Sequence, residues 1–87
     1  MSLDINELKR KIIYRSKYRG TKEMDILLSS FVESIISQLN KEELENLLNF
    51  LNMDDDNLYK YKQGLKTEVQ VSENKITRLF KDYIYKK

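Results

Sequence analysis

The sequence contains no cysteine, no histidine, no proline and no tryptophan, and it has only two glycines. Without cysteine the chain has no disulfide framework, no thiolate nucleophile and no thiolate ligand for zinc. Without histidine it lacks the side chain most often used as a proton shuttle near neutral pH and as a metal ligand. We therefore expect a protein that is not an enzyme, with no catalytic residues and no metal site.

Long apolar segments are also missing from the sequence. No apolar run approaches the roughly 20 residues that a membrane-spanning helix needs, and the N-terminus lacks the uninterrupted apolar segment of a signal peptide. We expect no membrane insertion and a cytoplasmic location. A length of 87 residues leaves room for one domain, residues 1–87, with one modest core and no deep pocket.

Charge is abundant, and it is arranged in three blocks. Residues 1–23 carry seven Lys or Arg against three Asp or Glu, residues 24–58 carry one against eight, and residues 59–87 carry eight against three. The net charges of these blocks are +4, −7 and +5, although the whole chain carries only +2. Such segregation either gives a dipolar surface that steers a partner or lets oppositely charged segments fold onto each other. The sequence favours neither.

Apolar residues at helical spacing predict two helices in the first half of the chain. Asp4 and Glu7 have the spacing of a capping box, which predicts a first helix ending near Ser16. Its apolar stripe is Ile5, Leu8 and Ile12. A second amphipathic pattern opens at Met24 and predicts the central core helix. Its stripe consists of Met24, Leu27, Leu28, Phe31, Val32, Ile35, Ile36 and Leu39.

Two more helices are predicted between residues 40 and 64. Asn40 and Glu43 repeat the capping-box spacing and open a third helix that ends near Asn52. Its stripe is Leu44, Leu47, Leu48 and Leu51. Three adjacent aspartates, residues 54–56, then precede a short fourth helix that Gly64 closes. These carboxylates suggest a cation site only weakly, because a calcium loop places its ligands at alternate positions; helix capping is the favoured interpretation.

The last part of the chain is predicted to form a connector and a fifth helix. Residues 67–71 alternate like a strand, but a lone strand has nothing to pair with, so we interpret them as an extended connector. Ser72 is expected to cap a fifth helix whose end frays at residues 85–87. Its apolar face is Ile76, Leu79, Phe80, Tyr83 and Ile84. The predicted fold class is therefore all-α, a small single-domain bundle of about five helices.

A charged corner separates the first two predicted helices, with the sequence Arg-Gly-Thr-Lys-Glu at residues 19–23. Gly20 permits a positive φ or the close approach of another backbone, which suits a corner built for binding. Alternatively, Gly20 only turns the chain between two helices. Arg19 and Glu23 are four residues apart, so they are also compatible with an ordinary intrahelical ion pair.

Two sequence blocks resemble a known family. The stretch YRSKYRGTKEMDILL at residues 14–28 resembles the signature of the small succinate dehydrogenase assembly factors, in which Arg-Gly-x-x-Glu precedes a hydrophobic residue and Asp. The stretch MDDDNLYKY at residues 53–61 is similar to that family's acidic turn followed by leucine and two aromatic residues. With the chain length and the five-helix order, the resemblance covers nearly the whole chain.

The resemblance implies an assembly factor rather than an enzyme. Members of this family bind the flavoprotein subunit of succinate dehydrogenase, or in some bacteria the related fumarate reductase subunit. They promote covalent attachment of FAD to a histidine of that subunit. The resemblance therefore implies that this chain has no cofactor of its own, since FAD belongs to the partner flavoprotein. We expect it to be a monomer when free.

The resemblance also implies which residues bind the partner: Arg15, Arg19, Gly20, Glu23, Asp25, Tyr59 and Tyr61. The Arg-Gly-x-x-Glu residues match the motif that faces the flavoprotein near its flavin attachment site. Tyr18 occupies a position at which many members carry a second arginine, so Arg15 or Lys17 is expected to compensate. Tyr59 and Tyr61 fall on the family's aromatic positions, although they are equally suited to closing the end of the bundle. A Gly20→Arg substitution is expected to preserve the fold and abolish flavin attachment.

A small nucleic-acid-binding module is the alternative function. Tyr14 and Tyr18 are interleaved with the basic residues Lys9, Arg10, Lys11, Arg15, Lys17 and Arg19, a composition that suits contacts to phosphates and bases. The basic C-terminal third adds further cations. The acidic middle block and the lack of a recognisable recognition helix argue against this alternative.

Overall fold

The computed structural model describes residues 4–68, 70–71 and 73–84, and among them it contains five α-helices and one short 3-10 helix. In chain order these are α1 (Ile5–Ser16), α2 (Lys22–Ile35), η1 (Ile36–Gln38), α3 (Lys41–Leu51), α4 (Asp55–Lys62) and α5 (Lys75–Asp82). The described residues form no strand, so the predicted all-α class with about five helices is confirmed. No helix in these ranges is both long and apolar enough to cross a membrane.

Side-chain caps fix the starts of α1 and α3 at the residues that the sequence predicts, although of these two helices only α3 has the complete capping box. The Asp4 carboxylate accepts a hydrogen bond from the Glu7 amide at 2.8 Å. At the start of α3, Asn40 and Glu43 form a complete capping box, in which each side chain accepts from the other residue's amide, at 2.8 and 2.9 Å. Each cap satisfies amides that have no partner within the helix, so the chain enters both helices at a defined residue.

The starts of α2 and α5 differ from the prediction. The α2 helix begins at Lys22, two residues before Met24, because the Thr21 hydroxyl caps it by accepting from the Met24 amide. The predicted cap of α5, Ser72, lies outside the described residues. The observed cap is Asn74, which forms a capping box with Thr77. Hydroxyl and carboxamide side chains are both good caps, and the choice among neighbouring candidates depends on where the helix packs.

The end of α2 differs from the sequence prediction, whereas the end of α4 agrees with it. The apolar pattern predicts a continuous helix to Leu39, but α2 ends at Ile35 and the tighter η1 turn replaces its last turn. At the end of α4, Gly64 has a φ of 75°. The Leu65 amide donates to the Lys60 carbonyl at 2.8 Å, and the Gly64 amide donates to the Tyr61 carbonyl at 3.1 Å. This pattern is a Schellman motif, so the predicted stop at Gly64 is confirmed.

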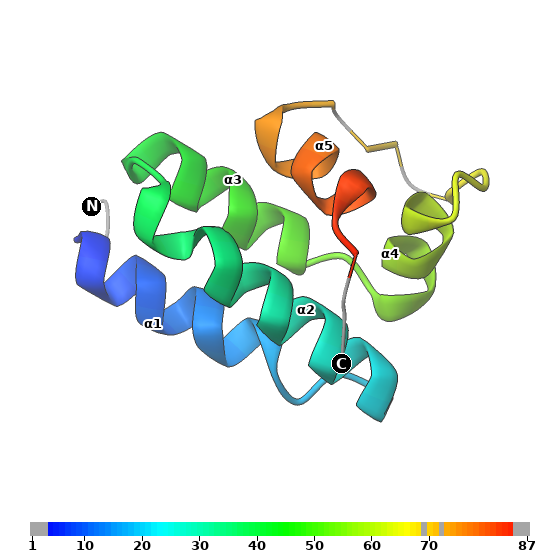
Figure 1. The fold of residues 1–87 in the computed structure, drawn as a ribbon, viewed down its shortest axis with the longest axis horizontal. Coiled ribbons are helices and arrows are strands. Elements are labelled where there is room, and N and C mark those ends of the chain that lie inside the picture. The colour runs from blue at the N-terminus through cyan, green and yellow to red at the C-terminus, as the bar shows by residue number, and fades with distance from the viewer. Residues whose placement is uncertain (1–3, 69, 72, 85–87) are drawn as a thin grey trace.

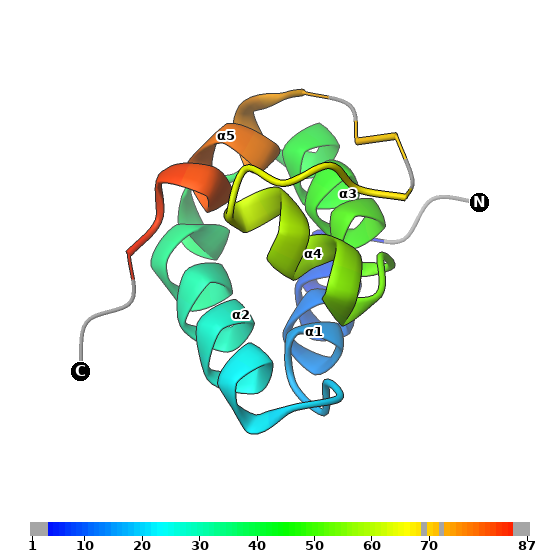
Figure 2. The same ribbon diagram turned by 90° about the vertical axis from the view of Figure 1, so that its right-hand side faces the viewer.

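The helices pack as a bundle in which α1 contacts both α2 and α3, while α5 contacts α3 and α4. Figure 1 shows α1 and α2 along the lower side, α3 and α5 above them, and α4 at the right-hand end. In the turned view of Figure 2, α4 faces the viewer between α2 and α3. The packing brings the corner between α1 and α2 to the same end of the bundle as the turn between α3 and α4.

Three phenylalanines from three helices form the centre of the core. Phe80 of α5 lies between Phe31 of α2 and Phe50 of α3, with ring centroids 5.2 and 5.1 Å apart and edge-to-face geometry in both pairs. Edge-to-face pairs are a preferred arrangement of buried aromatic rings. The other buried apolar side chains are Leu8, Ile12, Met24, Leu28, Val32, Leu39, Leu44, Leu47, Leu51, Leu58 and Ile76.

Most residues of the predicted apolar stripes are buried or half-buried, but three of them are exposed. Ile5, Leu79 and Ile84 are exposed. Ile5 lies in the first turn of α1, and Ile84 lies beyond the end of α5 at Asp82, where no helix holds it against the core. Thr77 occupies the buried face of α5 instead of Leu79, and Phe50 joins the core although the predicted stripe of α3 omitted it.

The charge blocks partly fold onto each other. Ion pairs join the acidic middle block to the basic blocks at Arg19 and Asp55, at Lys60 and Asp56, and at Lys75 and Glu43. The exposed cations Arg10 and Lys11 of α1, and Lys17 directly after it, form no ion pair with a described residue. The interpretation that oppositely charged segments fold onto each other is therefore confirmed for these three pairs, and the dipolar surface that steers a partner stays a prediction.

Candidate functional site

The corner between α1 and α2 is formed by residues 17–21. The Lys17 amide donates to the Tyr14 carbonyl at 3.2 Å, which ends α1. Tyr18 then adopts a positive φ of 58° and turns the chain. The sequence prediction offered Gly20 as a residue that permits a positive φ, but the structure places the positive φ at Tyr18. The requirement for glycine at position 20 therefore has another cause.

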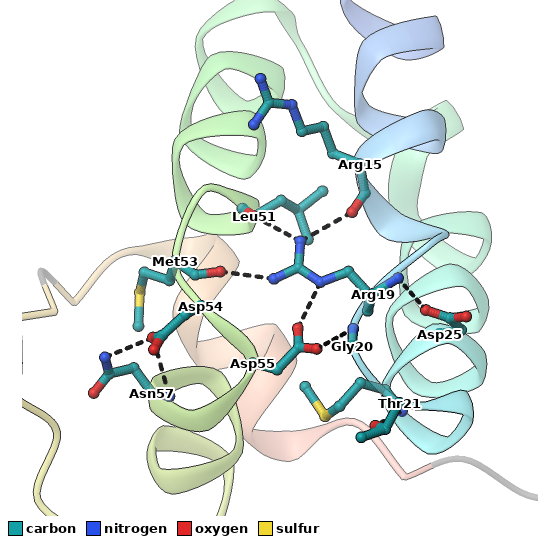
Figure 3. A network of polar contacts seen from close by, with 11 residues as sticks. Arg15, Arg19, Gly20, Thr21, Asp25, Leu51, Met53, Asp54, Asp55 and Asn57 are labelled. Carbon is teal, nitrogen blue, oxygen red and sulfur yellow. Dashed lines mark hydrogen bonds and ion pairs between the residues drawn. The ribbon is translucent and has the colours of Figure 1, made fainter.

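The guanidinium of Arg19 lies between α1 and the end of α3, with 11% of its side chain exposed. Its Nη1 donates to the Arg15 carbonyl at 3.0 Å and to the Leu51 carbonyl at 2.8 Å, and its Nη2 donates to the Met53 carbonyl at 2.6 Å. Figure 3 shows these hydrogen bonds around the guanidinium. The carbonyls at a helix C-terminus carry partial negative charge and lack partners in the helix, so a cation is favourable there.

Asp55, in the first turn of α4, completes the network. Its Oδ1 accepts from Arg19 Nε at 2.7 Å, and its Oδ2 accepts from the Gly20 amide at 2.6 Å (Figure 3). A Cβ atom on residue 20 would lie 3.0 Å from Asp55 Oδ2, closer than nearly all contacts of real Cβ atoms. Gly20 therefore lets the Asp55 carboxylate approach its backbone closely, and a Cβ atom at this position would force that carboxylate to shift.

The corner is also held from the α2 side. The backbone amide of Arg19 donates to the carboxylate of Asp25 (Figure 3). The consecutive backbone amides of Arg19 and Gly20 thus donate hydrogen bonds to carboxylates of two different helices, α2 and α4. Charge-assisted hydrogen bonds of this kind are stronger than neutral ones, so α1, α2, α3 and α4 meet in one braced corner.

Each aspartate of the acidic turn has its own partner. Asp54 caps α4 by accepting from the amide and the side-chain nitrogen of Asn57, at 3.3 and 2.6 Å. Asp55 binds Arg19 and Gly20, and Asp56 pairs with Lys60 at 3.0 Å. Among the described residues, no cluster of three acidic or other metal-ligating side chains has the geometry to hold a metal ion. The predicted capping role is confirmed for Asp54.

The Arg-Gly-x-x-Glu motif divides into an internal part and an exposed part. Arg19 and Asp25 bond within the fold, and the amide of Gly20 does the same. Glu23 is exposed on the first turn of α2 and forms no hydrogen bond or ion pair with a described residue. The alternative of an intrahelical Arg19–Glu23 pair is wrong, because Arg19 bonds to Asp55 and to three carbonyls.

Arg15 is exposed at the rim of this corner. Its Nη1 donates to the side-chain oxygen of Asn52, just after α3, at 2.7 Å. The contact places the Arg15 guanidinium beside the corner without burying it. The cation that the sequence analysis expected near the motif is therefore present, and one of its donors is already engaged.

The two tyrosines of α4 have different environments. Tyr61 is half-buried and packs edge-to-face against Phe50, with ring centroids 6.2 Å apart. Tyr59 is 52% exposed, and it lines a shallow surface depression with Thr21, Glu23, Met24, Asp55 and Asp56. Residues two apart on a helix point in different directions, so only one of the pair turns toward the core. Tyr59 accordingly shares the exposed surface with Glu23, and Tyr61 closes the bundle.

Two components of the site were missed by sequence reasoning. Asp55 was interpreted only as a capping aspartate, although its place in the second sequence block was a signal that it belongs with the corner. The carbonyls of Leu51 and Met53 carry no signal in the sequence at all, because every residue has a carbonyl and only the packing selects these two.

Comparisons with known proteins identify relatives of this chain. A family model described as flavinator of succinate dehydrogenase matches residues 10–84. The succinate dehydrogenase assembly factor 2 of Aspergillus flavus, a mitochondrial protein, is 34% identical over 79 residues, which cover 90% of this chain and 27% of the relative. The assembly factor 2-B of Drosophila ananassae, also mitochondrial, is 32% identical over 85 residues, covering 94% of this chain and 50% of the relative.

A bacterial relative is similar as well. The FAD assembly factor SdhE of Acetobacter pasteurianus is 40% identical over 50 residues, covering 58% of this chain and 46% of the relative. The chain spans about a quarter of the Aspergillus flavus relative and about half of the other two. No solved structure matches the chain. None of these relatives supports the nucleic-acid alternative.

Proposed function

We propose, because the chain belongs to the flavinator of succinate dehydrogenase family, that it binds the flavoprotein subunit of succinate dehydrogenase and promotes covalent attachment of FAD to it. The observation that carries this proposal is the family match over residues 10–84, which includes both sequence blocks that meet at the braced corner. The related fumarate reductase subunit is a further partner of the same class. We place this interaction in the cytoplasm, with the free protein as a monomer.

The geometry of the corner supports binding rather than catalysis. An assembly factor only needs to favour one conformation of its partner, whose own residues then perform the flavin chemistry. In this proposal FAD and the acceptor histidine belong to the flavoprotein. A rigid corner suits the role, because a surface that is already ordered loses less conformational entropy when it binds.

Glu23 is the residue that we assign to the partner contact within the motif. Its carboxylate is exposed and has no partner among the described residues, and the neighbouring Gly20 presents no side chain. Arg19 was expected to contact the partner, but all three nitrogen atoms of its guanidinium, Nε, Nη1 and Nη2, donate hydrogen bonds within the fold. We therefore assign Arg19, Gly20 and Asp25 to holding the corner, and Glu23 and Tyr59 to the contact surface.

Co-expression with the flavoprotein subunit from the same genome tests this function. Covalent flavin remains on the subunit after denaturation, so its fluorescence in a gel reports attachment directly. We expect fluorescence to require this chain and to fall strongly with Glu23→Ala. Glu33→Ala is the matched control, since Glu33 is also an exposed glutamate of α2 but lies ten residues farther along. Flavin attachment that is equal with and without this chain would overturn the proposed function.

A second measurement separates contact from stability. Because Glu23 forms no internal bond with a described residue, Glu23→Ala should change the free energy of unfolding by less than about 0.5 kcal/mol. A loss of flavin attachment together with unchanged unfolding would assign Glu23 to the partner contact. If flavin attachment and the free energy of unfolding both decreased, the assignment of Glu23 to that contact would be wrong.

A further inference from the structure

Tyr18 has a backbone conformation that its residue type disfavours. Its φ of 58° is the only positive φ of a non-glycine residue in the described ranges. In this left-handed region the Cβ atom of an L-residue lies too close to the following carbonyl oxygen, so glycine or asparagine is the usual occupant. The backbone conformation therefore does not account for a tyrosine at this position. Non-glycine residues with a left-handed conformation occur preferentially at functional sites.

The contacts that hold this conformation do not involve the Tyr18 side chain. The Lys17 amide bonds to the Tyr14 carbonyl on one side, and the Arg19 amide bonds to Asp25 on the other. A glycine at position 18 would retain both bonds and would adopt the same φ without strain. The fold would thus be served at least as well by a residue with no side chain.

The side chain itself contributes little to the fold. Tyr18 is 78% exposed, and its ring lies beside the ring of Tyr14, with centroids 5.4 Å apart. Tyr14 is itself 67% exposed. Neither hydroxyl bonds to a described residue. Two large aromatic rings, tilted by 47° to each other, therefore form a solvent-exposed surface at the end of α1, where burial does not account for them.

The surface formed by Tyr14 and Tyr18 is surrounded by charged residues and adjoins the braced corner. Tyr14 and Tyr18 line one shallow depression, whose other lining residues are Arg15, Lys17, Arg19, Gly20, Asp54 and Asp55. Lys17 is exposed, and so are Arg10 and Lys11 farther along α1. The depression is continuous with the braced corner, so a protein that contacts Gly20 and Glu23 also reaches the two rings.

We propose that Tyr14 and Tyr18 form a second contact surface for the flavoprotein partner, and that they pack against an apolar patch bordered by acidic residues. This inference rests on the proposed function. Tyrosine is enriched among the residues that dominate binding energy, because it buries a large area at a low cost in side-chain entropy. The unpaired cations of α1 favour an acidic border by charge complementarity.

Three substitutions at one position test the proposal. Tyr18→Phe keeps the ring, Tyr18→Ala removes it but keeps the Cβ atom, and Tyr18→Gly removes both. Affinity for the purified flavoprotein subunit is measured by titration calorimetry, and Tm by thermal unfolding. We expect Tyr18→Phe to bind like the unsubstituted protein, and both Tyr18→Ala and Tyr18→Gly to bind about tenfold more weakly.

Thermal unfolding should distinguish Tyr18→Gly from Tyr18→Ala, although the two variants are expected to bind equally weakly. Glycine relieves the left-handed strain that alanine retains, so the Tm of Tyr18→Gly should exceed that of Tyr18→Ala by about 4 °C. The two variants would then bind equally weakly although they differ in Tm, so the loss of affinity would not follow the loss of stability, as a merely structural role for Tyr18 requires. A Tyr18→Gly protein that melts below Tyr18→Ala would overturn the interpretation of the strain.

The remaining outcomes separate this inference from the proposed function. If the flavoprotein binds and Glu23→Ala weakens it, while Tyr18→Ala and Tyr18→Gly bind normally, this inference alone is wrong. If the unsubstituted protein does not bind the flavoprotein at all, the proposed function falls and this inference falls with it. Equal losses for Tyr18→Phe and Tyr18→Ala would exclude the ring as the contact. A Lys17→Glu variant that binds normally would exclude the acidic border.

Discussion

The carboxylate of Asp55 accepts a hydrogen bond from Nε of Arg19 at 2.7 Å, which joins the first turn of α4 to the corner between α1 and α2. The two residues are 36 positions apart in the sequence, and their side chains are only 11% and 23% exposed. The same carboxylate also accepts from the Gly20 amide. One side chain therefore holds both the arginine and the glycine of the motif in place.

Asp55→Asn should destabilise the fold and weaken partner binding. Arg19 and Gly20 donate to different oxygens of Asp55, and asparagine replaces one of these oxygens with an NH2 group, so one of the two donors would face another donor. We expect the free energy of unfolding to fall by about 1.5–3 kcal/mol, the usual contribution of a hydrogen bond to a charged group. Urea denaturation measures it.

Asp56→Asn is the control for Asp55→Asn. Its carboxylate is 66% exposed and pairs only with Lys60, and an exposed pair of this kind contributes about 0–1 kcal/mol. Equal losses in the two variants would show that the Arg19–Asp55 link has no special role.

Gly20→Ala should also destabilise the protein, through a steric route. The new Cβ atom would lie 3.0 Å from Asp55 Oδ2, so the carboxylate must shift and its bonds to Arg19 and Gly20 must lengthen. We expect a loss of about 1 kcal/mol in unfolding free energy. The sequence-based expectation that Gly20→Arg preserves the fold stays a prediction. Thermal unfolding checks the result, and an unchanged Tm would show that the corner relaxes freely.

Gly64→Ala provides a comparison with Gly20→Ala that isolates the cause. Nothing lies within 4 Å of a Cβ atom at Gly64, but its φ is 75°, so the cost there is backbone strain alone. If the cost at Gly20 is steric, Asp55→Ala should relieve it: Gly20→Ala should then cost much less in the Asp55→Ala background. No such relief is expected for Gly64→Ala. A double-mutant cycle measures both differences.

Glu43 should make stability depend on pH in the acid range. Its hydrogen bond from the Asn40 amide and its pairing with Lys75 hold the pKa of Glu43 below its ordinary value of 4.5. The folded state therefore binds a proton less readily than the unfolded state. Stability from this group is fully present above pH 4.5 and is lost as the pH falls through 4.5 toward the lower folded pKa.

Glu43→Gln removes that contribution. The variant should show a smaller decrease in unfolding free energy between pH 6 and pH 3 than the unsubstituted protein, measured by urea denaturation at each pH. Glu42→Gln is the control, because Glu42 is exposed in the same helical turn and pairs with no described residue. The prediction fails if the two variants have the same pH dependence.

Phe80→Ala should be the most damaging of these substitutions. Phe80 is fully buried and packs against two phenylalanines from other helices, so its removal leaves a cavity where three helices meet. We expect a loss of about 3–5 kcal/mol, a large fraction of the stability of a small domain. Leu65→Ala, at an exposed apolar residue, should change the unfolding free energy by less than about 0.5 kcal/mol. Calorimetric unfolding distinguishes the two.

The features that the sequence determined by itself depend on neighbours within about four residues. The all-α class, the caps at Asp4 and Asn40, and the glycine stop at Gly64 are of this kind. A helical amide bonds to a carbonyl four residues earlier, and caps act over three residues, so short patterns carry the necessary information. The same holds for the main stripe of α2, whose period alone indicates which face is buried.

The tertiary structure decided the rest. It selected Asn74 as the cap of α5, ended α2 at Ile35, and turned Tyr61 rather than Tyr59 toward the core. It also converted Arg19 from an expected partner contact into an internal brace. Three of the four partners of that guanidinium lie 32 to 36 residues away, and two of those three are backbone carbonyls that any residue would supply. Only the packing of α3 and α4 against the corner brings them together, because no local pattern specifies which distant carbonyl a side chain will meet.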